Sequence, residues 1–220
     1  MDKIAVRTYD PELTRQLYSR VIWIYDIWSR LTEEKALRTI LRWVNIRDGQ
    51  AVLEAGVGTG RLFSRITSLN KTGRNVGIDL SKKMLEKTRN KCGKHKNVKL
   101  LQADITNLPY DLGTFDRIIC SYVLDLLPEN LYVSILSRFR SMLQPEGKLI
   151  IAYMEAGSKP SHKFWAWVAE TFPRLMTHCR PINLETYLQE AGFTIEQKAD
   201  FTQLTFPSCV MEARVRGGVT

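Results

Sequence analysis

The sequence predicts an α/β fold built around a mostly parallel sheet. Short apolar segments that end in glycine, acidic or hydroxyl residues alternate with longer segments of helical pattern, and this alternation is typical of parallel strands joined by crossover helices. The predicted strands are residues 51–53, 75–79, 97–105, 115–121 and 148–153. Because the carboxyl ends of parallel strands meet at one edge of the sheet, polar residues at these ends predict a single ligand site.

The segment Glu54–Gly60, which reads Glu-Ala-Gly-Val-Gly-Thr-Gly, is the most informative part of the chain. It follows the first predicted strand and precedes a helical pattern. Gly56, Gly58 and Gly60 permit backbone angles that other residues avoid, and they let a ligand approach the main chain closely. This geometry suits a nucleotide-like cofactor, although a tight strand-to-helix turn uses the same residues.

Polar residues at three later strand ends strengthen the cofactor interpretation. Asp79 lies nineteen residues after Gly60, where a ribose-binding carboxylate occurs in a nucleotide-binding βαβ unit. Asp104 ends the next predicted strand, and Ser121 ends the fourth. A dinucleotide fold would also place a third glycine three residues after Gly60, but the chain has Phe63 there. A pyrophosphate-binding turn is therefore not predicted.

Four motifs together resemble the Rossmann-type S-adenosylmethionine-dependent methyltransferases. In family order they are Glu54–Gly60, Gly77–Ser81, Gln102–Pro109 and Leu143–Ile151. The resemblance implies a three-layer Rossmann-like sandwich with a seven-stranded, mostly parallel sheet whose last strand is antiparallel. It also implies S-adenosyl-L-methionine as the cofactor and S-adenosyl-L-homocysteine as the product formed from it.

The resemblance places cofactor-binding residues at the strand ends and in the segment before the first strand. They are Tyr25, Glu54, Gly56, Gly58, Thr59, Asp79, Leu80, Asp104, Ile105 and Ser121. Carboxylates are strong acceptors for ammonium and hydroxyl groups. Glu54 would therefore hold the methionine portion, Asp79 the ribose hydroxyls and Asp104 the adenine amino group.

The apolar and hydroxyl residues of this set have competing interpretations. Leu80, Met84 and Ile105 would pack on the adenine faces, but each is also an ordinary core residue. Ser121 lies where related enzymes contact the cofactor near its sulfur. Thr59 would do the same, or would cap the helix that follows it.

Two aromatic segments flank the predicted cofactor site. Residues 13–28 have apolar side chains at the spacing of an amphipathic helix, so residues 1–48 are predicted to form an N-terminal helical lid before a methyltransferase domain at 49–220. Residues 162–172 predict a second aromatic helix. Both segments contain few acids, which favours an apolar or amphipathic methyl acceptor. A core stripe or a membrane-interface stripe is the alternative for the N-terminal helix.

Methyl transfer needs an oriented nucleophile more than acid–base help, because the sulfonium is already activated. Tyr25 and Tyr153 are the candidate catalytic residues, which would orient the acceptor or relay its proton, with Tyr18 as a reserve. Tyr25-Asp26 and the short chain resemble both the small bacterial phosphatidylethanolamine N-methyltransferases and the quinone-biosynthesis C-methyltransferases. Arg61 stands where the quinone enzymes usually have an acid, so a phospholipid amine is the first prediction. Methylation of a quinone precursor, N- or O-methylation of a soluble small molecule, and a non-catalytic binding module are the alternatives.

Charge is distributed unevenly along the chain. The net charge is +9, and the segment from Arg61 to Lys99 holds twelve Lys or Arg residues but only two acids. A basic surface attracts anionic membranes or nucleic acid. The segment lacks the interleaved aromatics of nucleic-acid readers, so no nucleic-acid partner is expected. Peripheral contact with an anionic membrane and a solvated basic face are both left open.

Composition and cysteine usage set further bounds. Hydrophobic residues at 44% and charged residues at 25% are ordinary for a globular domain. The sequence lacks an apolar stretch of the roughly 18 residues that span a bilayer, and it lacks a signal-peptide pattern. We expect a cytoplasmic protein, with peripheral attachment to the inner face of the membrane as the open alternative. The four cysteines and three histidines have no ligand spacing, so no metal site is expected. The oligomeric state is not predicted.

Overall fold

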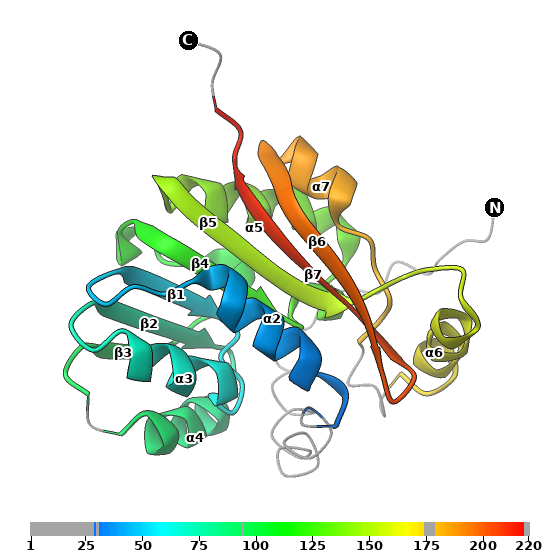
Figure 1. Ribbon diagram of the computed structural model, residues 1–220, viewed down its shortest axis with the longest axis horizontal. Helices are drawn as coiled ribbons and strands as arrows, with labels where there is room; N and C mark the ends of the chain where they lie inside the picture. Colours follow the sequence, from blue (N-terminus) through cyan, green and yellow to red (C-terminus); the bar gives the residue numbers. More distant parts are fainter. Residues whose placement is uncertain (1–28, 30, 94, 174–178, 218–220) are drawn as a thin grey trace.

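The computed structural model describes residues 29, 31–93, 95–173 and 179–217, which form a three-layer α/β architecture (Figure 1). Its strands are β1 (Ala51–Ala55), β2 (Arg74–Asp79), β3 (Val98–Gln102), β4 (Phe115–Ser121), β5 (Leu143–Met154), β6 (Phe193–Gln203) and β7 (Phe206–Val215). Its α-helices are α2 (Glu34–Val44), α3 (Arg61–Leu69), α4 (Lys82–Cys92), α5 (Tyr132–Ser141), α6 (Pro160–Thr171) and α7 (Glu185–Glu190). Short 3-10 turns follow β3 and β4.

The described strands form one seven-stranded sheet in the order β3-β2-β1-β4-β5-β7-β6. Neighbours from β3 to β5 are parallel, whereas β7 is antiparallel to both β5 and β6. The predicted sheet with its antiparallel last strand is therefore confirmed. The strand order reverses between β1 and β4, and in open α/β sheets such a switch point creates a crevice at the carboxyl ends of the strands.

Helices cover both faces of the sheet because its central strands are apolar on both sides. Val52 and Leu53 are adjacent in β1 and both fully buried, so they face opposite layers. Val52 belongs to a core cluster with residues of α2 and α3, and Leu53 to a larger cluster with residues of α5 and α7. Figure 1 shows α2 and α3 in front of the sheet and α5 behind it.

Helix α2 lies within residues 1–48, the segment predicted to form the lid. Leu37, Ile40 and Val44 of this helix are buried against the sheet, in one cluster with Ile119 and Ile150. The described part of the predicted lid at 1–48 is therefore one layer of the domain. The predicted amphipathic helix at 13–28 lies outside the described residues.

The predicted aromatic helix at 162–172 is confirmed as α6, which lies beyond the end of β5 (Figure 1). Trp165, Val168 and Ala169 pack on Met154 and Phe206 at the ends of β5 and β7. Among the described helices, none is both long and apolar enough to cross a bilayer.

Candidate active site

A tight turn joins β1 to α3, and its glycines adopt left-handed backbone angles. Gly56, Gly58 and Gly60 have φ values of 83°, 52° and 79°. The Gly56 N–H donates to the Ile78 carbonyl oxygen at 2.7 Å, which fixes the turn to β2. A Cβ on Gly56 would collide with the Val123 side chain, whereas a Cβ on Gly58 would have no atom of the described residues within 4 Å. The turn therefore leaves open space beside the main chain at Gly58.

Asp79, at the end of β2, is hydrogen-bonded to this turn. Its Oδ2 accepts from the Gly58 N–H at 2.8 Å, and its Oδ1 accepts from the Ser81 N–H at 2.8 Å. Burial raises the pKa of Asp79 to about 6, against the two backbone hydrogen bonds, which lower it. Each oxygen keeps a second acceptor position, so the carboxylate retains capacity to accept from a ligand's hydroxyl groups.

Glu54, at the carboxyl end of β1, is a buried acid with a free acceptor atom. The residue is 1% exposed, and its Oε2 has no hydrogen-bond partner among the described residues. Burial raises the pKa of Glu54 well above its usual value, and the negative charge of Asp79 raises it further. A buried carboxylate of this kind is costly unless a cation pairs with it. The site therefore favours a ligand that brings a positive group to Glu54.

The remaining predicted cofactor residues line the neighbouring strand ends. Asp104 Oδ1 accepts from both the N–H and the hydroxyl of Thr106, each at 2.8 Å, at the start of a 3-10 turn. Leu80 and Ser121 are half-buried at the ends of β2 and β4, so both remain accessible in part. Ile105 is buried and belongs to the main core cluster.

Thr59 is bonded to a neighbouring helix. Its hydroxyl oxygen accepts from the Lys91 ammonium at 3.2 Å, which links the glycine turn to α4. The N-cap residue of α3 is Gly60, and that helix start has no side-chain cap hydrogen bond. Thr59 therefore does not cap α3 in this structure.

The structure places Tyr153 in the core, which corrects its predicted catalytic role. The residue is 0% exposed, and its hydroxyl lies 3.8 Å from the Met211 sulfur. Burial raises the pKa of Tyr153 above its ordinary value. Tyr153 belongs to the main core cluster. Tyr25, the other predicted catalytic residue, lies outside the described residues.

An acidic residue that sequence reasoning did not single out follows β4. Asp125 is 0% exposed, and its Oδ2 accepts from the Met154 N–H at 3.0 Å and from the Cys179 thiol at 3.4 Å. Its Oδ1 has no hydrogen-bond partner among the described residues. Burial raises the pKa of Asp125 to about 6, although nearby Arg180 lowers it.

A second acid with a raised pKa, the half-buried Glu33, is the N-cap residue of α2. Burial and then the negative charge of Asp125 raise the pKa of Glu33 to about 8, whereas Arg61 lowers it. The phenol of Tyr122 is close enough for Glu33 and Asp125 to raise its pKa as well, after burial. Glu33, Tyr122 and Asp125 are thus near enough to influence one another's ionisation, and Tyr122 and Asp125 lie at the carboxyl ends of β4 and β5. We call Glu33, Tyr122 and Asp125 the acidic cluster.

Arg61 joins the residues before α2 to the glycine turn. Its guanidinium donates to the Ser29 hydroxyl at 2.9 Å and forms an ion pair with Glu34 at 2.6 Å. From the other side, the Gln203 side chain donates to the Leu31 carbonyl oxygen at 2.7 Å. The start of α2 is thus held at the carboxyl edge of the sheet, above the switch point.

Comparison with protein families identifies the domain. Residues 52–147 match the family model described as a methyltransferase domain. The chain carries an S-adenosylmethionine-dependent methyltransferase domain. The matched segment begins in β1 and ends within β5, so it contains the glycine turn and the strand ends described above.

Individual relatives of this methyltransferase are distant. Demethylmenaquinone methyltransferase of Staphylococcus aureus (strain MRSA252) is 25% identical over 193 residues, which cover 83% of this chain and 78% of that protein. Magnesium protoporphyrin IX methyltransferase from Synechocystis PCC 6803, solved with S-adenosylhomocysteine, has a TM-score of 0.74 at 19% identity, covering 94% and 100% of the two chains. The N-methyltransferase NodS from Bradyrhizobium japonicum WM9, solved with the same product, has a TM-score of 0.73 at 16% identity, covering 93% and 99%.

The residues of the methyltransferase site fit S-adenosylmethionine. The unpartnered, buried oxygen of Glu54 suits the ammonium of the methionine portion, and the open space at Gly58 admits a ligand against the main chain. Asp79 offers two oxygens to the ribose hydroxyls. When bound, the cofactor supplies a methyl group on a sulfonium, which is already activated for transfer.

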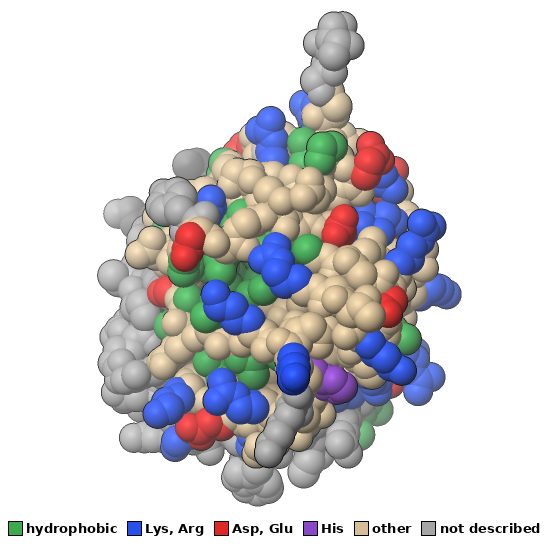
Figure 2. All heavy atoms as spheres, turned by 90° about the vertical axis from the view of Figure 1, so that its left-hand side faces the viewer, with side chains coloured by type: hydrophobic (Ala, Val, Ile, Leu, Met, Phe, Trp, Pro, Cys, Tyr) green, Lys and Arg blue, Asp and Glu red, His purple; other side chains and the backbone are tan. Residues whose placement is uncertain are grey.

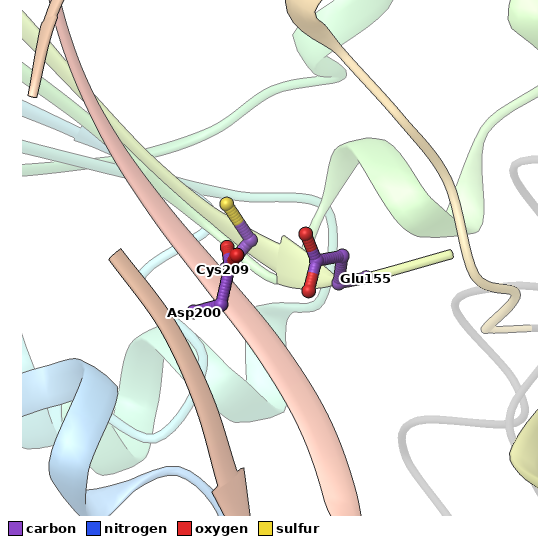
Figure 3. A group of neighbouring side chains, drawn as sticks. All are labelled: Glu155, Asp200 and Cys209. Carbon is purple, nitrogen blue, oxygen red and sulfur yellow. The ribbon is translucent and has the colours of Figure 1, made fainter. Parts of the chain in front are cut away.

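A group of potential metal ligands lies elsewhere on the methyltransferase. The side chains of Glu155, Asp200 and Cys209 converge at the junction of β5, β6 and β7, with ligand atoms within 4.8 Å of one another (Figure 3). Lys198 forms ion pairs with Glu155 at 3.2 Å and with Asp200 at 3.8 Å. Because the lysine ammonium pairs with both acids, we interpret the group as an ion-pair network.

Proposed function

We propose that this methyltransferase transfers the methyl group of S-adenosylmethionine to the amine nitrogen of an amphipathic acceptor, with a phospholipid amine as the first candidate. The observation that carries the proposal is the acidic cluster at the switch point. A desolvated ammonium is stable only beside a carboxylate, and Asp125 provides a buried one with an unpartnered oxygen.

The acidic cluster would also accept the proton that the reaction must remove. An ammonium has no lone pair, so it loses one proton to Asp125 or Glu33 before the nitrogen reacts. The nitrogen lone pair then forms the new N–C bond, and the electron pair of the broken C–S bond stays on the sulfur. S-adenosylhomocysteine leaves, and the carboxyl group returns its proton to water. Raised carboxyl pKa values of about 6 and 8 suit a base that operates near neutral pH.

We propose the cofactor contacts as follows, residue by residue. Glu54 and the Gly56 and Gly58 main chain hold the methionine portion, and Asp79 binds the ribose. Asp104 accepts from the adenine amino group, while Leu80 packs on the adenine ring.

Ser121 lies beside the sulfur, and Ile105 donates its backbone N–H to a ring nitrogen of adenine. Thr59 is a further proposed contact near the sulfur, and its hydroxyl oxygen also accepts from the Lys91 ammonium. Tyr25 remains a proposed contact from the segment before α2.

Carbon methylation of a quinone precursor is the second candidate, and the demethylmenaquinone methyltransferases among the relatives favour it. In that reaction the acidic cluster would take the phenolic proton of a hydroquinone, the ring carbon would form the bond to methyl, and the ring proton would then leave. Both acceptors are amphipathic, so the two candidates share the same class of binding site.

A methyl-transfer assay separates the candidates. The purified protein is incubated with methyl-tritiated cofactor and mixed micelles that contain phosphatidylethanolamine, a demethylated hydroquinone or a soluble amine, and products are identified by mass spectrometry. We expect methylated phospholipid, and loss of turnover in Asp125→Asn but not in the control Asp111→Asn, whose carboxylate is exposed before β4. Label only in the hydroquinone would establish the second candidate, and label only in soluble amines would overturn both. Absence of turnover with every acceptor would indicate a binding module.

A further inference from the structure

Large apolar side chains are exposed mainly at one end of the described molecule. The exposed examples are Leu31 (49%), Phe164 (50%), Trp167 (55%), Phe172 (49%), Leu204 (65%) and Leu69 (55%). Leu69 ends α3, on the amino-terminal side of the sheet. The other five come from the start of α2, the tip of the β6–β7 hairpin, and α6 with the residue after it. We call these five residues the apolar rim.

Hydrogen bonds hold the parts of the apolar rim together. Gln203, at the end of β6, donates to the Leu31 carbonyl oxygen at 2.7 Å and accepts from the Lys35 N–H at 2.9 Å. On the other side of the hairpin tip, the Trp165 indole donates to the Thr205 hydroxyl at 3.2 Å. Figure 1 shows the hairpin tip between α6 and the start of α2. The apolar rim is therefore a defined surface rather than a set of unrelated side chains.

The helical periodicity of α6 places two of its aromatic side chains in solvent. His162, Trp165 and Val168 are buried, so the intervening positions Phe164 and Trp167 project outward. The ring centroids of these two residues lie 6.2 Å apart, and a third ring, Phe172, lies 6.1 Å from Trp167. Contiguous exposed aromatics of this kind mark an interaction surface, and Trp is typical of the bilayer interface.

The charges around the apolar rim fit an anionic bilayer. Lys35, Lys159 and Lys163 are exposed on or next to α2 and α6, and Glu170 is the exposed acid of α6. The acid at the start of α2, Glu34, is neutralised by Arg61. Exposed rings flanked by lysines are the composition of elements that lie in the headgroup region of a membrane.

We propose that the apolar rim docks on the surface of an anionic lipid bilayer, with the site at the carboxyl ends of the strands facing the lipid. The inference rests on the proposed function to the extent that the acceptor is amphipathic. Figure 2 shows the side of the molecule away from α6, where Lys and Arg side chains are spread widely. Because positive charge is also present there, charge attraction alone would not select one orientation. The rings of α6 provide that selection, and an acceptor in the bilayer then reaches the switch point without entering water.

Vesicle sedimentation without any methyl acceptor tests the docking surface. Vesicles of phosphatidylcholine, with or without phosphatidylglycerol, are mixed with wild-type protein, Phe164→Ser/Trp167→Ser and the control Leu69→Ser. The control removes an equally exposed apolar side chain far from the apolar rim. We expect the wild type and the control to sediment with anionic vesicles, and the double variant to partition at least about tenfold more weakly. Unchanged affinity for S-adenosylhomocysteine by calorimetry verifies that each variant is folded.

Three outcomes would overturn the docking proposal. The first is equal sedimentation of the double variant and the wild type, and the second is no sedimentation of the wild type. The third is a wild type that self-associates in lipid-free sedimentation velocity while the double variant does not, which would make the apolar rim an interface between copies. Failure of the proposed function is separable, because turnover of detergent-dispersed acceptor needs no bilayer. The double variant should keep that rate and lose turnover of acceptor in vesicles.

Discussion

At the scale of single residues, Asp79 has a structural role and a proposed binding role. Its two oxygens already accept hydrogen bonds from the glycine turn and from the start of α4. A change at this position therefore alters both the ligand contact and the shape of the turn. Asn keeps one acceptor oxygen, whereas Ala keeps none.

We expect Asp79→Ala to weaken cofactor binding by roughly 1.5–3 kcal/mol, the usual effect of losing hydrogen bonds to a charged group. Asp79→Asn should show an intermediate loss, since one of the two backbone hydrogen bonds survives. Isothermal titration calorimetry with S-adenosylmethionine measures both. An affinity in the alanine variant equal to that of the wild type would remove Asp79 from the site.

Glu54 allows a prediction with opposite effects on stability and binding. Its pKa is raised by burial and by Asp79, so ionisation of Glu54 disfavours the ligand-free fold. Glu54→Gln keeps the shape and removes the charge. At pH 8 we expect a higher thermal midpoint for the ligand-free variant and a weaker affinity for S-adenosylmethionine, whose ammonium loses its partner. A variant that is less stable and binds equally well would contradict the assignment.

The acidic cluster makes catalysis depend on pH. A base must be ionised, and the pKa values of Asp125 and Glu33 are raised to about 6 and about 8. The turnover number should therefore rise between pH 6 and pH 8, with Tyr122, Cys179 and the Arg180 guanidinium as the other groups around Asp125. Asp125→Asn should lower the turnover number by roughly 10²-fold, the usual worth of a general base. A flat pH profile in the wild type would exclude the cluster as the base.

The candidate site residues that the sequence indicated differ from those that it did not indicate in how close they lie to a recognisable motif. Asp79 and Glu54 were predictable because they sit at fixed distances from a glycine turn. Asp125 and Glu33 lie in irregular segments without a motif, and only the fold brings them together. Tyr153 was misjudged because it lies at the end of a predicted strand. Its side chain faces the core. Because β5 is apolar on both faces, the sequence pattern of that strand does not show which face each residue occupies.

At the scale of elements, the glycine turn offers a matched pair of substitutions. Gly58→Ala adds a methyl group into open space at the cost of a left-handed backbone angle, about 1 kcal/mol. Gly60→Ala places its Cβ 2.8 Å from the Thr88 Cα, where backbone must move. We expect Gly60→Ala to lose about 2 kcal/mol or more of stability.

Cofactor affinity should fall most in Gly58→Ala, the variant that loses less stability. Gly58→Ala should fold nearly as stably as the wild type but bind the cofactor weakly, because the methyl group fills the space next to the main chain. Chemical denaturation and calorimetry on both variants provide the comparison. Wild-type affinity in Gly58→Ala would show that the ligand does not approach the turn at this residue.

Sequence pattern predicted the strands of the cofactor half better than the remaining elements. β4 matches its predicted range, and β1, β2 and β3 differ by a few residues at their ends. β5 begins at Leu143 because Phe115 of β4 pairs with it, a tertiary contact that local pattern does not encode. α2 was assigned to the lid because it precedes the first strand, whereas its buried side chains place it on the sheet.

At the scale of the whole molecule, one topological feature organises the site. The parallel strand order brings Glu54, Ser121 and the acidic cluster to the same edge of the sheet, although they are distant in sequence. The sequence could predict this convergence, because polar strand ends in a parallel sheet must meet. It could not predict the acceptor side, because α2 and the turn after β4 are positioned by packing.

The buried acids make the stability of the ligand-free protein fall as pH rises. The pKa of Glu33 is raised to about 8 and that of Glu54 well above its usual value, in both cases chiefly by burial. As pH rises toward 8, the folded state therefore retains protons that the unfolded state has already lost. Each such proton lowers the unfolding free energy by about 1.4 kcal/mol per pH unit. His162, whose pKa is lowered, is neutral in both states across most of this window and does not offset the trend.

We therefore expect the thermal midpoint of the ligand-free protein to decrease from pH 6.5 to pH 8, and the decrease to be smaller in Glu54→Gln. Cofactor affinity should change in the opposite sense, because the ammonium of S-adenosylmethionine pairs with ionised Glu54 and ionisation becomes easier as pH rises. Differential scanning calorimetry of the ligand-free protein, and titration calorimetry in buffers of different ionisation enthalpy, measure the two trends and the proton released on binding. A midpoint that rises with pH, or binding that releases no proton, would mean that Glu54 is already ionised in the free enzyme and that the ligand's charge is met elsewhere.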